Sequence, residues 1–258
     1  MNKEEKKPHK NDNIRNLPNK SLVKKLETKM FLLEQEIEER KKLEKKLHSA
    51  IKEKETLLRE IHHRVKNNMQ LISSLLRLQS RFIKDEKTQE VLKETVSRIK
   101  SIALVHERVY QSGNLSQIDF RPYIHHLTDH LAHLFLDEAK NIKIEVESDE
   151  IHFSIGQAVP CGLILTELVS NALKHAFPGN KAGKVIVRME KDKKGFYNLI
   201  VEDSGTGLPD GINLENPNTL GLMLVKDSVQ QLEGNLKVKK KEGTVFKITF
   251  PASPADES

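Results

Sequence analysis

The sequence of 258 residues has one cysteine, Cys161, and no tryptophan. A single cysteine excludes an internal disulfide, so nothing in the chain favours an oxidising compartment. No apolar run reaches the roughly 18 residues that a membrane-spanning helix needs, and the polar first residues lack the apolar core of a secretory signal. We therefore expect a cytoplasmic protein that does not insert into a membrane.

The sequence also lacks the charge distribution of a nucleic-acid-binding protein. Its net charge is +6, but residues 1–50 carry +5 of this, interleaved with acidic residues, and the other 208 residues carry +1. No aromatic residues alternate with the basic ones to stack on bases. We expect a solvated, mixed-charge helix here and no nucleic-acid partner.

Proline and glycine are absent from residues 20–111, so nothing interrupts a long helix there. Apolar residues recur at seven-residue spacing in two complementary registers, as in an imperfect coiled coil. The first register contains Leu26, Leu33, Leu47 and Ile61; the second contains Leu43, Ala50, Leu57 and Leu71. We expect a disordered tail over residues 1–19 and a signalling coiled coil over residues 20–55.

A helical hairpin is predicted for residues 56–113. The apolar pattern stops at Phe82-Ile83, which places a turn at residues 84–87, and a second helical pattern then runs to Gly113. Two helices with one apolar stripe each cannot bury those stripes alone. A homodimer that closes a four-helix bundle solves this, so we expect a dimerisation domain.

After Gly113 the pattern changes to an α+β domain over residues 119–251, followed by a tail at residues 252–258. Helices are expected at 119–139, 156–176 and 219–233. Alternating apolar residues predict strands at residues 142–146, 184–189, 196–201, 236–238 and 244–250. This order favours a sheet covered on one face by helices.

Two adjacent histidines lie on the first hairpin helix. At 100° per residue, His63 lies about 170° from the centre of the apolar stripe, and His62 lies about 70° from it. His63 therefore points to solvent and is the better phosphoacceptor, whereas His62 flanks the helix contact. Asn67, one turn later, shares the face of His63 and could hydrogen-bond one ring nitrogen.

The segment LLREIHHRVKNNMQLISSLLRLQ, residues 57–79, resembles the phosphoacceptor box of sensor histidine kinases. The resemblance is to a subgroup related to the HWE kinases, in which the histidine is followed by Arg-x-x-Asn. Most other histidine kinases carry an acidic residue directly after the acceptor, and Arg64 occupies that position here. The general base is therefore not identified.

A nucleotide site is predicted around residues 167–175. Glu167 and Asn171 are spaced i,i+4 on one helix, and Lys174 follows one turn later. The segment resembles the Bergerat (GHKL) ATP-binding fold, an α/β sandwich. The resemblance implies that Asn171 coordinates magnesium, Lys174 contacts phosphate and His175 lines the pocket. It also implies that Glu167 activates the nucleophile or supports the metal.

Two glycine-containing segments and a closing strand extend this resemblance, which covers residues 55–250. In Asp203-Ser-Gly205-Thr-Gly207, the aspartate matches the residue that accepts a hydrogen bond from adenine, and the glycines shape the turn. Gly221 matches a second glycine box at a helix start, after a short ATP lid at residues 208–218. Thr244 matches a residue near the adenine. No P-loop sequence occurs.

These features predict an ATP-dependent protein-histidine kinase that phosphorylates His63 and passes the phosphoryl group to an aspartate of a response-regulator receiver domain. Magnesium and ATP are the expected cofactors, and an upstream sensor protein or domain is the expected input. Two alternatives remain open. One is a GHKL ATPase that uses hydrolysis for conformational clamping, which Glu167 fits, and the other is a non-catalytic dimeric scaffold.

Overall fold

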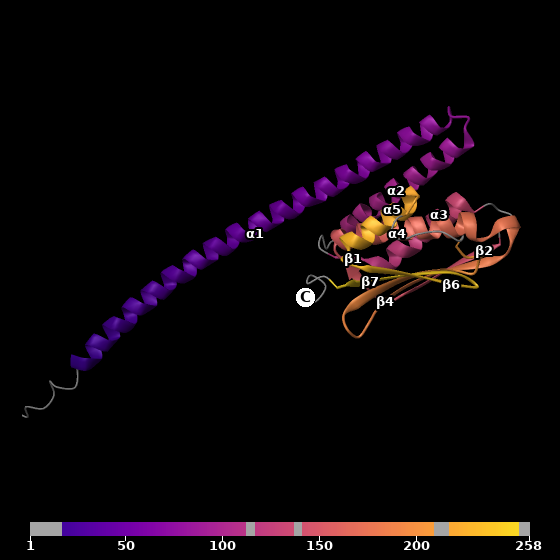
Figure 1. Ribbon diagram of the computed structural model, residues 1–258. Coiled ribbons are helices and arrows are strands. Elements are labelled where there is room, and N and C mark those ends of the chain that lie inside the picture. Colours follow the sequence, from indigo (N-terminus) through magenta and orange to yellow (C-terminus); the bar gives the residue numbers. More distant parts are fainter. Residues whose placement is uncertain (1–16, 112–116, 137–140, 209–216, 253–258) are drawn as a thin grey trace, which may run out of the picture. The chain divides into compact units, whose positions relative to one another are not determined.

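The computed structural model describes residues 17–111, 117–136, 141–208 and 217–252 (Figure 1). The chain divides into two compact units, residues 1–56 and residues 57–258. We describe each unit by itself.

The described part of the first unit is helical and belongs to α1, Leu17–Ser80. The helix begins three residues before the predicted start, and its apolar heptad residues are exposed in the single chain, as at Leu26 and Leu33. An uninterrupted helix is expected here because the segment lacks proline and glycine. No described helix is both long enough and apolar enough to cross a bilayer.

The second unit begins with a helical hairpin. Its first helix is the end of α1, and its second is α2, Glu86–Gln111. Asp85 caps α2, since its carboxylate accepts hydrogen bonds from the backbone N–H and the hydroxyl of Thr88. The turn therefore occupies residues 81–85, close to the predicted residues 84–87.

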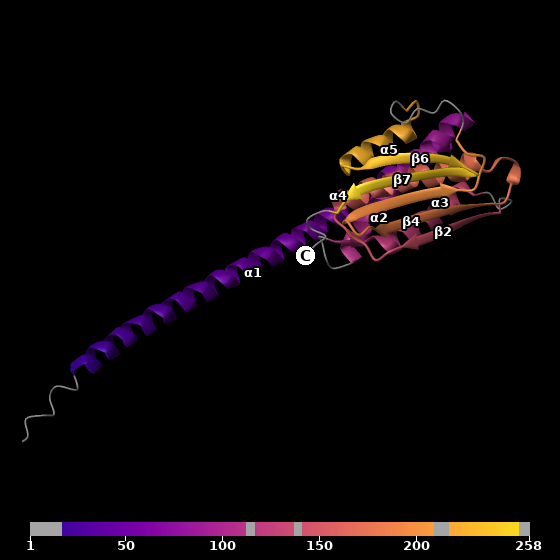
Figure 2. The same ribbon diagram turned by 60° about the horizontal axis from the view of Figure 1, so that its bottom comes forward.

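The rest of the unit is a five-stranded sheet with helices on one face (Figure 2). The strand order is β2-β4-β5-β7-β6, in which β2 pairs with β4 in parallel and the other pairs are antiparallel. The strand bounds are β2 Ile142–Ser148, β4 Gly183–Lys191, β5 Phe196–Asp203, β6 Asn235–Lys241 and β7 Gly243–Pro251. This confirms the predicted α+β class and all five predicted strands.

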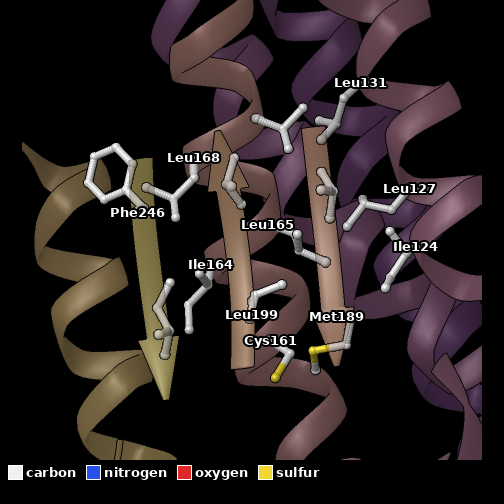
Figure 3. Packing of buried hydrophobic residues seen from close by; sticks show 14 of the residues in the cluster. Ile124, Leu127, Leu131, Cys161, Ile164, Leu165, Leu168, Met189, Leu199 and Phe246 are labelled. Atoms are coloured by element: carbon white, nitrogen blue, oxygen red, sulfur yellow. The ribbon is translucent and has the colours of Figure 1, made fainter. Parts of the chain in front are cut away.

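Three helices cover this face: α3, Phe120–Phe135; α4, Ile155–Asn171; and α5, Leu220–Gln231. Leu127 of α3 and Leu165 of α4 point into the core that they form with strand residues such as Leu199 (Figure 3). Helix α4 is the centre of this layer, because α2, α3 and α5 all contact it. These contacts hold α4 in place and so fix the positions of its polar residues.

The structure differs from the sequence expectations in two places, and some predicted segments lie outside the described residues. The two-residue strands β1, Ile118–Asp119, and β3, His152–Phe153, were not predicted, because a two-residue segment has no periodicity to read. The helix expected at 156–176 changes at Ala172 into a π-helical turn, η1, Ala172–Ala176. Most of the predicted ATP lid, residues 209–216, lies outside the described residues, as do residues 1–16 and 253–258 of the predicted tails.

Candidate functional site

The two histidines of α1 differ in their surroundings. His62 is buried, with 9% of its surface exposed, and faces α2, whereas His63 is half-buried. Asn67, one turn further on, is exposed. Glu60, one turn before Arg64, pairs with it, with 2.7 Å between its carboxylate and the Arg64 Nε.

A pair of side-chain contacts holds α1 and α2 together beside His63. The Nδ1 atoms of His62 and His106 are 3.0 Å apart, so one ring donates a hydrogen bond to the other. Four residues later, the Lys66 ammonium lies 2.6 Å from the Glu107 carboxylate. Burial lowers the pKa of His62, and burial together with the neighbouring His62 lowers the pKa of His106. A lowered pKa favours the neutral form, so both imidazole rings favour the neutral form in the folded protein.

The second group of predicted residues lies where α4 ends and η1 begins. Glu167 is buried on the last turns of α4, Asn171 is its final residue, and Lys174 lies in the π-helical turn. A π-helical turn makes i→i+5 hydrogen bonds and shifts the residues after it around the helix axis. His175, next in sequence, is exposed. Asn171 is half-buried, and the Lys174 side chain is 10% exposed.

Glu167 is held by an arginine that was not predicted for the site. The Arg98 Nε of α2 donates to one carboxylate oxygen at 2.6 Å, and the Arg98 Nη2 donates to the other at 2.9 Å. Both residues are less than 10% exposed, and this two-pronged contact raises the pKa of the Arg98 guanidinium. Removing either partner would leave a buried charge unpaired, which typically costs about 3–5 kcal/mol.

Lys174 is also paired with residues of α2. Its ammonium lies 3.1 Å from the Glu90 carboxylate and forms a still shorter ion pair with Glu94. It also lies over the ring of Phe135, 5.2 Å from the ring centre. Arg98 links its contact with Glu167 to the contacts of Lys174, because its Nη2 also lies 3.2 Å from the Glu94 carboxylate.

The ends of β5 and β7 bring Asp203 and Thr244 together. The two residues are opposite each other in the antiparallel register, and both are buried. The Asp203 carboxylate accepts a hydrogen bond from the Gly205 N–H at 2.9 Å, which closes the turn after β5. A Cβ at Gly205 would collide with the Ala176 carbonyl, so only glycine lets this turn pack on η1. Gly207 has a φ of 79°, in the region that favours glycine.

The start of α5 completes the site. The Thr219 hydroxyl caps this helix by accepting a hydrogen bond from the Leu222 N–H at 3.4 Å. Gly221 lies against the Glu167 carboxylate, since a Cβ there would come 2.5 Å from one of its oxygens. The helix start therefore directs backbone N–H groups toward the same region as the end of α4.

The predicted site residues thus lie on two groups of elements, here called the first and second clusters. The first contains His63 and Asn67 on α1. The second combines α4–η1 with the β5 turn, the start of α5 and the start of β7: Glu167, Asn171, Lys174, His175, Asp203, Gly205, Gly207, Gly221 and Thr244.

Sequence reasoning missed the residues of α2 that contact the second cluster. Glu90, Glu94 and Arg98 occur at i, i+4 and i+8, which places them on one helix face. That spacing was available in the sequence as a sign of a charged contact face. Nothing in the sequence indicated that the partners would be Glu167 and Lys174, because those pairs join residues 69 and 80 positions apart.

Both halves of the second unit match known families. Residues 60–135 match a family described as histidine kinase. Residues 156–254 match the family of histidine kinase-, DNA gyrase B- and HSP90-like ATPases. The two matches include both clusters: the first covers the α1 histidines and α2, and the second covers α4 to β7.

Two relatives named as histidine kinases are similar to most of the chain. It is 34% identical over 214 residues to the sensor histidine kinase PdtaS of Mycobacterium tuberculosis, which is 80% of this chain and 42% of that protein. It is 28% identical over 196 residues to blue-light-activated histidine kinase 2 of Erythrobacter litoralis, 74% of this chain and 56% of the relative. The chain thus spans about half the length of these relatives.

Among solved structures, the histidine kinase domain of the blue-light activated histidine kinase EL346 of Erythrobacter litoralis is similar. It matches with a TM-score of 0.61 and 24% identity, over 80% of this chain and 97% of that chain. This likeness shows a shared fold.

Proposed function

Because the chain belongs to the histidine kinase family, we propose that it is an ATP-dependent protein-histidine kinase whose phosphoacceptor is His63. The observation that carries this proposal is the pairing of two sites in one compact unit. One is a nucleotide-type cluster at the ends of α4, β5 and β7, and the other is a half-buried histidine on a helical hairpin.

The second cluster has side chains suited to each part of ATP. The buried Asp203 carboxylate can accept a hydrogen bond from the adenine amino group, beside Thr244. Lys174 supplies the positive charge for the phosphates, and the start of α5 supplies backbone N–H groups. Gly205 lets the turn after β5 pack closely on η1, and Gly221 lets the start of α5 pack closely on Glu167, because neither has a side chain.

A magnesium ion fits this donor set. Hard cations such as magnesium prefer oxygen ligands, and the Asn171 side-chain carbonyl, at the end of α4, is a neutral oxygen that can share the ion with phosphate oxygens. Magnesium bound there would neutralise charge on the phosphates. Glu167 lies one turn before Asn171 and is engaged by Arg98, so in this arrangement it supports the site rather than removing a proton.

The proposed reaction moves one phosphoryl group. A ring nitrogen of His63 forms a bond to the γ-phosphorus, and the bond from that phosphorus to the β,γ-bridging oxygen breaks, so that ADP leaves with the electron pair. The imidazole loses its N–H proton to solvent. The phosphoryl group then passes from His63 to an aspartate carboxylate of a response-regulator receiver domain.

We also propose that the chain acts as a homodimer. The hairpin part of α1 has large apolar side chains exposed in the single chain, each more than 40% exposed. They are Leu57, Ile61, Leu71, Ile72, Leu75 and Leu78. A second copy that covers this stripe would complete a four-helix bundle.

The test is labelling with γ-labelled ATP and magnesium, comparing wild type with His63→Gln and His62→Gln. We expect acid-labile, alkali-stable label in wild type and in His62→Gln, and none in His63→Gln. Circular dichroism melting of each variant checks that the substitutions leave the fold intact. Label that persists in His63→Gln would overturn the acceptor assignment.

The same experiment separates the kinase from a clamp ATPase. Steady release of inorganic phosphate that survives both substitutions, without protein-bound label, would indicate hydrolysis instead of histidine phosphorylation. A protein that binds no nucleotide would instead be a scaffold.

A further inference from the structure

The residues proposed to handle the nucleotide are held by one face of α2. Lys174 is paired with Glu90 and Glu94, and Glu167 is paired with Arg98. The side chains of Lys174, Arg98 and Glu167 are at most 10% exposed. Lys174 and Glu167, two charged residues of the proposed nucleotide site, are therefore each paired with an oppositely charged residue of α2.

The charges of this cluster oppose the binding of a phosphate. Lys174 and Arg98 contribute +2, and the three carboxylates of Glu90, Glu94 and Glu167 contribute −3, so the five side chains sum to −1. A triphosphate that approaches Lys174 must replace a carboxylate already bound there. A carboxylate and a phosphate are both oxyanions, and they compete for the same ammonium group.

The structure also provides a place for the displaced carboxylate. Glu94 contacts both Lys174 and the Arg98 Nη2, so it can leave the lysine and keep its pairing with the arginine. Arg98 meanwhile retains both hydrogen bonds to Glu167. The exchange therefore does not leave a buried charge without a partner.

We propose that Glu94 and Arg98 are positioning residues: Glu94 makes nucleotide binding compete with its own contact to Lys174, and Arg98 keeps Glu167 in place. The proposal rests on the proposed role of Lys174 as a phosphate contact. The phosphates take the place of Glu94 on Lys174, and Arg98 holds Glu167 in position throughout.

A regulatory consequence follows from linkage. If the nucleotide weakens the contact of α2 with Lys174, then any change that moves Glu94 away from Lys174 must strengthen nucleotide binding by the same factor. Helix α2 is joined to α1 by the His62–His106 and Lys66–Glu107 contacts. A displacement of α2 within the hairpin would thus set the affinity for ATP.

The test measures the Kd for a non-hydrolysable ATP analogue with magnesium, by titration calorimetry on the full chain. Glu94→Gln changes the cluster from −1 to 0, and Glu90→Gln with Glu94→Gln changes it to +1. Glu147→Gln is the control, because Glu147 also loses one charge from an ion pair, with Arg188, but lies on β2, outside α2 and the nucleotide cluster.

We expect the Kd to fall about threefold or more in Glu94→Gln, and further in the double variant, while Glu147→Gln stays at the wild-type value. The gain should shrink as salt is added, because screening weakens the carboxylate that competes. An unchanged or higher Kd in both Glu94 variants would overturn the proposal.

A third variant distinguishes this proposal from the function on which it rests. Lys174→Gln in the Glu90→Gln/Glu94→Gln background should abolish the gain in affinity. If Lys174→Gln has no effect there, the role of Lys174 as a phosphate contact is wrong. If it weakens binding but the two glutamate substitutions never strengthened it, the phosphate contact stands and only the competition with α2 fails.

Discussion

At the scale of single residues, the adjacent histidines show how burial gives neighbouring side chains different chemistry. His62 is turned toward α2 and shares a hydrogen bond with His106, and His63 keeps part of its surface accessible. The angle between His62 and the apolar stripe predicted that His62 flanks a contact between helices. The sequence could not identify His106 as its partner, because the two are 44 residues apart.

The lowered pKa of both rings predicts a dependence of stability on pH. A histidine whose folded pKa lies below 6.5 binds its proton first in the unfolded state, so acid favours unfolding. We expect the contribution of this pair to the free energy of unfolding to be constant above about pH 7 and to fall as the pH drops below 6.5. Urea unfolding at a series of pH values measures this.

The variant His106→Gln should lose about 1 kcal/mol at pH 7.5 through the altered hydrogen bond, and its stability should fall less between pH 6.5 and 5. His152→Gln is the control, because His152 is exposed on β3. It should keep the wild-type pH profile. If His106→Gln and wild type lose the same stability over this range, the pair does not cause the dependence.

At the scale of elements, three other helices, α2, α3 and α5, pack against α4. A glycine of α4, Gly162, sets how closely α3 approaches it. A Cβ at Gly162 of α4 would collide with the hydroxyl of Tyr123 on α3. That buried hydroxyl donates a hydrogen bond to the Ser101 carbonyl of α2 at 3.2 Å. Gly162 therefore leaves room for a contact that joins three helices.

This contact predicts a non-additive pair of substitutions. Tyr123→Phe should lose about 1 kcal/mol with the hydrogen bond. Gly162→Ala should lose about 1–3 kcal/mol by overpacking, because its methyl group displaces the phenol. The double variant should lose less than the sum, since Phe lacks the oxygen that the methyl group meets. Urea unfolding followed by circular dichroism gives the four free energies, and strict additivity would contradict the packing argument.

The elements of this chain were largely predictable because their periodicities are clear. The stretch without proline or glycine predicted α1 and α2, and alternation predicted the five strands of the sheet. The π-helical turn at Ala172–Ala176 was not predictable, because its sequence continues the apolar pattern of α4. The nucleotide cluster was predicted by resemblance, whereas Arg98 and Glu94 required the contact of α2 with α4.

At the scale of the whole molecule, the proposed assembly follows from apolar surface that one chain leaves exposed. On the hairpin part of α1, Ile72 is 43% exposed and Leu75 is 52% exposed, and both belong to the exposed apolar stripe proposed above as the dimer contact. Within the chain, α1 meets α2 through polar residues such as His62 and Lys66. The apolar stripe is therefore the surface available to a second copy.

This argument predicts that Leu75→Glu converts a dimer into a monomer. A glutamate at a buried position of a four-helix bundle would lose its hydration without gaining a partner, which disfavours association. Light scattering after size exclusion should give twice the chain mass for wild type and the 29.5 kDa of one chain for Leu75→Glu. Gln70→Glu adds the same charge about 140° around the helix, at an exposed residue, and should remain dimeric. A wild-type mass of 29.5 kDa at tens of micromolar, or a dimeric Leu75→Glu, would show that this stripe is not the dimer contact.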